Sequence, residues 1–188
     1  VLAADPIVRA ASRQERADRL HTLAAVLGSV PGISAAYVGW PNGDFVLLRP
    51  IGRNGERLQP PPGARWLVQW AGADGARFDL LDAQLKAIES RPQPDFAFDP
   101  RTRPWFADAV GAPGTVLTAP YIFFTTREPG ITAARKAETG AVAGVDLALR
   151  ELSERLPRGR PAASTVAAVL DRQGRVVEGV DLGQDHVA

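Results

Sequence analysis

The residues best suited to binding chemistry lie in one short, proline-rich stretch of the chain. Phe98 to Phe106 reads F-D-P-R-T-R-P-W-F, which places two arginines, two prolines and large aromatic rings within one loop. Prolines reduce the entropy cost of holding an irregular loop in one conformation. A guanidinium held in such a loop offers paired donors for a carboxylate, and a neighbouring tryptophan can line an apolar pocket and attract a cation. The stretch therefore predicts a binding site for a small organic ion.

A structural role is the alternative for the same residues. Trp105 and Phe106 can simply fill the core, while Asp99 and the two arginines hold the loop in place. The residue types alone leave both interpretations open.

The rest of the sequence contains no convincing catalytic constellation. Catalysis usually needs a positioned base, and the two histidines, His21 and His186, lie near opposite ends of the chain. The nucleophile elbow G-x-S-x-G, the phosphate-binding P-loop and the zinc motif H-E-x-x-H are absent from the sequence. We expect no catalytic residue and no enzymatic activity in this chain. An enzyme would require carboxylates with perturbed pKa values clustered in a cleft.

Composition narrows the possible partners and cofactors. None of the 188 residues is cysteine, which excludes disulfides, zinc sites built on thiolates and cysteine nucleophiles. The 22 basic and 21 acidic residues give a net charge of +1, which argues against a nucleic-acid-binding surface. We expect no metal site and no other cofactor.

From its first residue and its composition, we expect this chain to be a fragment of a longer protein, or a processed or edited form of one. The chain opens at Val1 and contains no methionine. No apolar run approaches the roughly 18 to 20 residues that cross a bilayer, and no signal peptide is visible. Any membrane anchor is therefore expected outside this chain.

One long helix is expected at the N-terminus. Asp5 is a suitable N-cap, Pro6 suits the first helical position, and the helical pattern runs from Ile7 to Leu27 until Gly28 ends it. The first half of this helix is polar and the second half is richer in leucine. Such a helix either packs against a second copy of the chain or lies on the surface of its own core.

The remaining pattern indicates an α+β fold with one antiparallel sheet flanked by helices. Asn42-Gly43 predicts a hairpin between Ile33–Trp40 and Phe45–Leu48. Further strands are expected at Arg65–Ala71, as a pair within Arg77–Ser90, and at Thr115–Phe124, Ile131–Ala137 and Ala141–Leu149. Short helices are expected at Trp105–Val110 and Arg150–Leu156, and a last hairpin at Thr165–Leu170 and Arg175–Gly179.

Three separate motifs carry a resemblance to a known family. They are Asp99 to Phe106, then Ala119-Pro120-Tyr121, then Gly144-Val145-Asp146-Leu147. In order and spacing they resemble the signatures of Cache sensor domains, especially the double-Cache group, whose first motif reads D-P-R-x-R-P-W-Y. The resemblance covers approximately Ile7 to Leu156. Asp171 to Gly174 is similar to the D-x-x-G turn that starts the membrane-proximal module of double-Cache domains.

This resemblance implies a fold and a division of the chain. The fold is a PAS-like antiparallel five-stranded sheet with a long N-terminal helix. Residues 1–28 would be a signalling and dimerisation helix, 29–156 a PAS-like ligand-sensing module, and 157–188 a linker and the first hairpin of a second, incomplete module.

The resemblance also implies a cellular role. Cache domains are extracytoplasmic sensors of bacterial transmembrane chemoreceptors, histidine kinases, nucleotide cyclases and phosphodiesterases. The chain would thus be the periplasmic part of an inner-membrane protein, forming a homodimer through the N-terminal helix. Tyr121 to Thr126, followed by Glu128 to Thr132, is similar to the version found in adenylate/guanylate cyclases and HD-type phosphodiesterases.

Family members that bind free amino acids suggest the site residues. In those receptors an arginine and a tryptophan hold the carboxylate, while a tyrosine and an aspartate receive the ammonium. The matching positions, together with the aromatic residue after the tryptophan, give the predicted ligand-binding set: Arg103, Trp105, Phe106, Tyr121 and Asp146.

The chain departs from the family pattern at two aromatic positions. Phe106, and less directly Phe98, stand where a tyrosine is usual. Without these hydroxyls a small carboxylate or an amine is an alternative to an amino acid. A ligand-free structural or protein-interaction module with the same fold is a further alternative.

Overall fold

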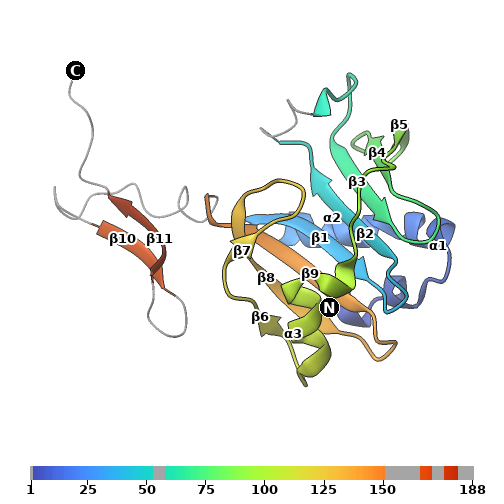
Figure 1. Cartoon of the computed structure of the whole chain (residues 1–188). Coiled ribbons are helices and arrows are strands. Elements are labelled where there is room, and N and C mark those ends of the chain that lie inside the picture. Colours follow the sequence, from blue (N-terminus) through green and yellow to red (C-terminus); the bar gives the residue numbers. More distant parts are fainter. Residues whose placement is uncertain (1, 53–57, 151–165, 171–175, 182–188) are drawn as a thin grey trace, which may run out of the picture.

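The computed structural model describes residues 2–52, 58–150, 166–170 and 176–181 (Figure 1). The helical segments are the 3₁₀ turns η1 (Leu2–Ala4), η2 (Pro6–Arg9) and η4 (Pro100–Thr102) and the helices α1 (Arg13–Ala17), α2 (Leu20–Ser29) and α3 (Pro104–Gly111). The strands are β1 (Ile33–Gly39), β2 (Phe45–Pro50), β3 (Trp66–Ala71), β4 (Arg77–Leu81), β5 (Ala87–Pro92), β6 (Val116–Leu117), β7 (Tyr121–Ile122), β8 (Pro129–Lys136), β9 (Val142–Ala148), β10 (Val166–Leu170) and β11 (Val176–Asp181).

An antiparallel sheet of nine strands forms the centre of the molecule. Its order is β5-β4-β3-β2-β1-β9-β8-β6, and β7 also pairs with β8. The α+β class and the antiparallel arrangement are confirmed, but the expected count of five strands is wrong. The hairpin Arg77–Pro92 extends one edge of the sheet, and the expected strand Thr115–Phe124 is divided into β6 and β7 at the other.

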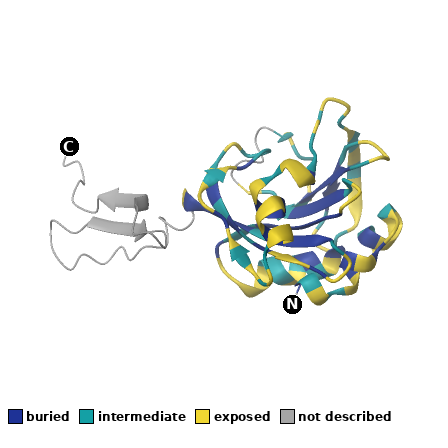
Figure 2. Cartoon of the chain, turned by 60° about the horizontal axis from the view of Figure 1, so that its bottom comes forward, coloured by how far each residue is buried: buried dark blue, intermediate teal, exposed yellow. Residues whose placement is uncertain are grey.

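The two faces of the sheet are covered by different helices. Ala36 and Val38 of β1 pack in the same cluster as Leu20 and Leu23 of α2. Successive side chains of a strand point to opposite faces. Accordingly, Tyr37 packs in another cluster, with Trp105 and Ala109 of α3. Figure 1 shows α2 behind the sheet and α3 in front of it, and Figure 2 shows the largely buried strands between exposed outer surfaces.

The expected continuous helix from Ile7 to Leu27 is wrong. The segment begins as the 3₁₀ turn η2, becomes extended at Ala10, and restarts at Ser12, whose hydroxyl caps α1 by accepting from the Glu15 N–H. Ile7 and Val8 are both buried. The turn η2 therefore lies against the core, in the same cluster as Leu20 and Leu23 of α2.

A buried arginine holds this N-terminal segment against the sheet. The guanidinium of Arg16 donates to Ala10 O at 3.2 Å, pairs with Asp44 at 2.9 Å and lies 3.9 Å from the centre of the Trp40 ring. The indole N–H of Trp40 donates to Val8 O. These contacts explain why the segment folds into the domain; the homodimer expected through it stays a prediction.

The first hairpin forms as expected. Residues Ala36 to Gly39 pair with Phe45 to Leu48, and Gly43 in the turn has φ of 93°, a conformation that glycine adopts without strain. The expected strands at Arg77–Ser90 are also confirmed, as β4 and β5.

The last hairpin is confirmed as a separate two-stranded sheet of β10 and β11. The expected turn at Asp171 to Gly174 and the expected helix Arg150–Leu156 lie outside the described residues, apart from Arg150. The division at residues 28 and 156 stays a prediction. None of the described helices is long and apolar enough to cross a membrane.

A glycine on β9 makes room for a site residue. Gly144 lies opposite Tyr37 in the β1–β9 pairing, and a Cβ at position 144 would collide with the Tyr37 ring. We expect Gly144→Ala to lower the free energy of unfolding by about 1–3 kcal/mol, because the ring must move to avoid the new methyl group. Urea denaturation of the chain measures this loss.

Gly28→Ala is the matched control, since a Cβ at position 28 would meet nothing within 4 Å. This helical substitution should be neutral or stabilise the chain by up to about 1 kcal/mol. Equal effects of the two substitutions would contradict the steric role of Gly144.

Candidate functional site

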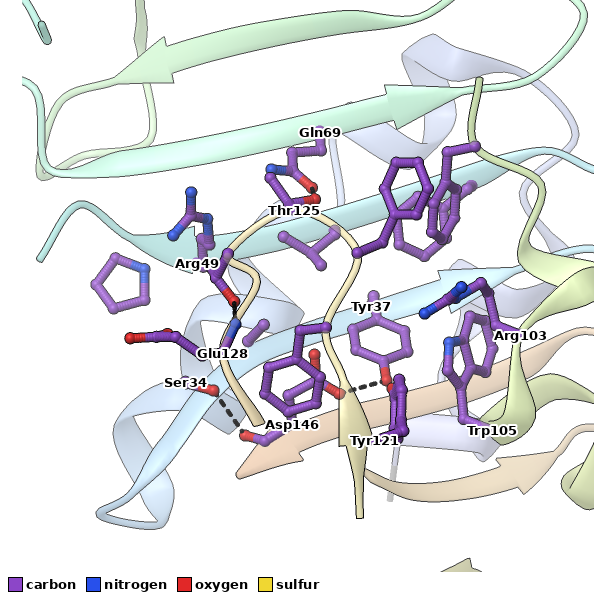
Figure 3. A pocket seen from close by; sticks show the side chains of 18 of the residues that line it. Ser34, Tyr37, Arg49, Gln69, Arg103, Trp105, Tyr121, Thr125, Glu128 and Asp146 are labelled. Atoms are coloured by element: carbon purple, nitrogen blue, oxygen red, sulfur yellow. Dashed lines mark hydrogen bonds between the residues drawn. The ribbon is translucent and has the colours of Figure 1, made fainter. Parts of the chain in front are cut away.

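A cavity of about 440 Å³ lies on the α3 side of the sheet (Figure 3). Side chains from four strands line its floor: Ala35, Tyr37, Phe45, Leu47, Arg49, Gln69 and Asp146. Its walls come from the loop before α3, from the first turn of α3, and from the segment between the start of β7 and the start of β8: Phe98, Arg103, Trp105, Tyr121, Phe123, Phe124, Thr125, Thr126 and Glu128. The volume falls within the roughly 300–1,000 Å³ typical of small-molecule sites.

Strand register explains why distant residues share this floor. Gln69 lies opposite Leu47, and Leu47 lies opposite Tyr37. Ala35 lies opposite Asp146 on the next strand. Residues directly opposite each other point to the same face, so the pairing aligns these side chains across the sheet.

The two arginines of the proline-rich loop have different roles. Arg101 forms a salt bridge with Asp99 at 2.7 Å, and the hydrogen bond from Arg101 lowers the pKa of Asp99. Asp99 also accepts from the Arg101 backbone N–H, which caps the turn η4. Arg101 therefore holds the loop in place, while Arg103 lines the cavity.

Arg103 lies against the cavity's aromatic wall. Its guanidinium carbon is 5.7 Å from the centre of the Tyr121 ring and 5.6 Å from that of Phe124, and Nη2 donates to Ile122 O at 3.3 Å. Trp105, on the first turn of α3, packs against Tyr37 with ring centroids 4.8 Å apart. Figure 3 shows Arg103 and Trp105 together on one side of the cavity.

Asp146 is buried within a cluster of hydroxyl groups. Tyr37 donates to its Oδ1 at 2.5 Å, and Thr132 donates to the same oxygen at 2.6 Å. Because the single hydroxyl proton of Thr132 is used in this bond, the Tyr121 hydroxyl, 2.7 Å away, donates to Thr132. Both direct bonds end on Oδ1, so they orient the carboxyl group without using Oδ2.

Burial changes the acidity of this cluster. It raises the pKa of Asp146 to about 7, while the hydrogen bonds from Thr132 and Tyr37 and the charge of Arg103 act in the opposite direction. Burial, with the nearby charge of Asp146, also raises the pKa of Tyr121 to about 12. At neutral pH the tyrosine is therefore a donor, and the carboxyl group is divided between its two forms.

Four of the five predicted ligand-binding residues line the cavity: Arg103, Trp105, Tyr121 and Asp146. Phe106 is not among the lining residues. It is 6% exposed, packs edge-on against Trp105, and lies next to Gly39 of β1. Phe106 fills the core under α3, so its missing hydroxyl does not alter the cavity wall. Phe98 does line the cavity.

Several polar residues on the other side of the cavity were not predicted from the sequence: Ser34, Arg49, Gln69, Thr125, Thr126, Glu128 and Arg150. Two of them carried a usable signal. Gln69 interrupts the apolar strand W-L-V-Q-W-A, and Arg49 follows the apolar run F-V-L-L. A polar residue at a position expected to be buried indicates either a hydrogen-bonded core or a ligand site.

Comparisons with known proteins agree with this architecture. No family model matches the chain. The chain is 32% identical over 169 residues to Adenylate cyclase 1 of Rhizobium meliloti, which covers 85% of this chain and 25% of that protein. It is 37% identical over 99 residues to the methyl-accepting chemotaxis protein McpG of Pseudomonas putida, covering 52% of this chain and 16% of that protein.

A solved structure shows the same fold. The ligand-binding domain of the Pseudomonas fluorescens chemoreceptor CtaA, in complex with L-isoleucine, matches with a TM-score of 0.55 and 22% identity. The match covers 94% of this chain and 56% of that one. The chain thus spans about a quarter of the length of Adenylate cyclase 1 and about half of the CtaA domain.

The fold is that of the ligand-binding domains of chemoreceptors. The three motifs, the fold and the relatives together place the chain among the Cache sensor domains.

The raised pKa of Asp146 makes a prediction for stability. An unfolded aspartate has a pKa of about 3.9, so the folded chain holds this proton more tightly than the unfolded chain does. This carboxyl group therefore lowers stability progressively as the pH rises from about 4 through 7. Asp146→Asn removes this titrating group. Between pH 4 and pH 8 we therefore expect the free energy of unfolding of the variant to rise by roughly 2–4 kcal/mol relative to that of the wild type.

Urea denaturation at a series of pH values measures the difference. Asp108→Asn, which replaces an exposed aspartate on α3, should keep the wild-type pH dependence. If the free energies of unfolding of Asp146→Asn and the wild type change equally from pH 4 to pH 8, burial does not raise the pKa of this carboxyl group.

Proposed function

We propose that this chain is the small-molecule-sensing domain of a bacterial transmembrane signalling protein, and that its cavity binds a free amino acid. One observation carries the proposal: a cation, Arg103, and a buried carboxyl group, Asp146, line the same cavity. They are close enough for the charge of Arg103 to lower the pKa of Asp146. A zwitterion needs one anchor of each sign in a partly dry site.

Arg103 is suited to the ligand's carboxylate. Among the described residues it forms no ion pair within 4.0 Å, and its one hydrogen bond, to Ile122 O, uses a single N–H. The planar guanidinium can therefore present paired donors to a carboxylate. Trp105 closes the apolar wall next to it.

Asp146 is suited to the ligand's ammonium. Tyr37 and Thr132 fix Oδ1, so Oδ2 can accept from an ammonium group. A bound cation favours the ionised carboxylate and so would lower the pKa of Asp146, which burial raises. Ligand binding would thus relieve part of the electrostatic cost of burying this carboxylate.

The middle of the cavity is apolar and aromatic. Leu47, Phe45 and Phe98 line it, and the Phe45 and Phe98 ring centroids are 4.5 Å apart. Such a wall suits the carbon chain of an amino acid. The CtaA domain of similar fold was solved with L-isoleucine, which supports this class of ligand.

A ligand-free structural module is the weaker alternative. Aromatic packing would fill the cavity in such a module, whereas about 440 Å³ stays open here. The cavity also contains a buried carboxyl group that no basic residue pairs with directly within the described part of the chain.

The rest of the longer protein is proposed from the relatives. Adenylate cyclase 1 and the chemotaxis protein McpG support a signalling output and membrane anchors outside this chain, with the sensor on the periplasmic side. A homodimer through the N-terminal segment belongs to the same proposal.

The two anchors are tested by calorimetric titration of the purified chain with a panel of L-amino acids, their decarboxylated amines and their deaminated acids. We expect intact amino acids to bind best, because only they engage both anchors. Arg103→Gln and Asp146→Asn should each weaken binding at least tenfold, since truncating one partner of a buried charged contact costs about 2–5 kcal/mol.

Arg101→Gln is the control, because this arginine lies in the same loop but outside the cavity lining. It should bind as the wild type does. If no amino acid binds, or if all three variants behave alike, this site does not recognise a zwitterion.

A further inference from the structure

Two buried nitrogen donors line the cavity without an acceptor. Among the described residues, three buried side-chain nitrogen or oxygen atoms have no hydrogen-bond partner: Arg49 Nε, Gln69 Nε2 and Arg77 Nε. Arg49 and Gln69 are both cavity-lining residues, and the unpartnered Nε2 of Gln69 belongs to a residue that is 1% exposed. The amide is therefore a built feature of the cavity and not part of a solvated surface.

Leaving such donors unpaired has a cost. A buried donor without an acceptor costs about 1–3 kcal/mol, and native proteins rarely leave one uncompensated. Two that line one cavity point to an acceptor supplied from outside the chain.

The neighbours of Gln69 fix its orientation. Its Oε1 accepts from the Thr125 hydroxyl at 3.0 Å, in the segment that follows β7. Since the carbonyl end of the amide is held by Thr125, the N–H₂ end is the one left for a ligand. Figure 3 shows Thr125 next to Gln69, with Arg49 and Glu128 on the side of the cavity away from Arg103.

The charges on this side also favour an acceptor. Burial lowers the pKa of Arg49, and the nearby carboxylate of Glu128 acts against that shift. Glu128 itself pairs with Arg150 at 3.5 Å. The described lining residues here thus include two guanidinium groups and one carboxylate, an arrangement that suits an oxygen with negative charge or a lone pair better than a second ammonium.

The strand order places this polar group beyond the amino-acid anchors. Gln69 is on β3 and Asp146 is on β9, with β2 and β1 between them. At about 4.8 Å per strand the two strands lie roughly 14 Å apart, so a ligand held at Asp146 reaches toward Gln69 only through its side chain. Leu47 and Tyr37 line the floor along that path.

We infer that Gln69 and Arg49 form a second polar subsite that binds a carbonyl or carboxylate oxygen at the end of the ligand's side chain. The preferred ligands are then amino acids with a carboxamide or carboxylate side chain, in preference to aliphatic ones. This inference rests on the proposal that the cavity binds a free amino acid. It adds which kind of amino-acid side chain the cavity prefers.

Calorimetric titration of the 188-residue chain with L-glutamine, L-glutamate and L-norleucine tests the subsite. The wild type should bind L-glutamine or L-glutamate at least about tenfold more tightly than L-norleucine, which has a similar length but no acceptor. Gln69→Leu should reduce this preference about tenfold and leave L-norleucine binding unchanged or stronger. Gln84→Leu, at an exposed glutamine outside the cavity, should change neither value.

Arg49→Gln distinguishes the two acceptors. If the subsite recognises the negative charge of a carboxylate, this variant weakens L-glutamate binding more than L-glutamine binding. If the subsite recognises the oxygen acceptor of a carboxamide, the two affinities fall by a similar factor. If Gln69→Leu does not fold, the wild-type preference and Arg49→Gln decide the question.

The failure of this subsite is distinguishable from the failure of the site as a whole. Equal binding of all three ligands, still dependent on Arg103 and Asp146, would overturn the second subsite and leave the amino-acid function standing. Binding of none of a full amino-acid panel would remove the function on which the subsite rests.

Discussion

The site depends on one carboxyl group that the fold holds in a nearly dry environment. Burial disfavours the charged form of Asp146, and two hydroxyl bonds and the charge of Arg103 compensate only in part, so its pKa stays near 7. Several neighbouring residues hold Asp146 in this position. Gly144 lets the Tyr37 ring lie close to β9, and Thr132 on β8 bonds Asp146 and joins it to the Tyr121 hydroxyl. A site in this state gains most from a ligand that brings its own positive charge.

The same sheet gives the cavity a link to the rest of the domain. Strand β1 contributes Tyr37 to the cavity and, on its other face, Ala36 and Val38 to the packing against α2. A change in the charge state or position of the cavity residues therefore acts on strands whose opposite face carries the N-terminal segment. Closely packed layers transmit such shifts because they contain few voids to absorb them. This arrangement offers a physical route from ligand to signal by a shift between two conformations.

The sequence allowed some parts of this structure to be predicted because local residue chemistry determined them. Asn42-Gly43 indicated the first hairpin, and the resemblance of three motifs to Cache domains indicated four residues that do line the cavity. The prediction of one continuous N-terminal helix was wrong because the course of this segment depends on tertiary contacts. Arg16 contacts Ala10, Asp44 and Trp40, and the spacing of apolar residues does not indicate these contacts. Arg49 and Gln69 were missed for a similar reason. The pairing of strands far apart in sequence decides which face of the sheet a residue occupies. It also decides whether that face is covered by a helix, exposed to solvent or part of a cavity.

The most direct test of the central claim is the proton balance of binding. Calorimetric titration of the tightest-binding L-amino acid at pH 7, in two buffers with different ionisation enthalpies, counts the protons exchanged. Because burial raises the pKa of Asp146 to about 7 and a bound ammonium favours its ionised form, we expect release of up to about half a proton per ligand. The release should fall towards zero at pH 8, where the carboxyl group is already mostly ionised. Binding without proton release at pH 7 would contradict the account.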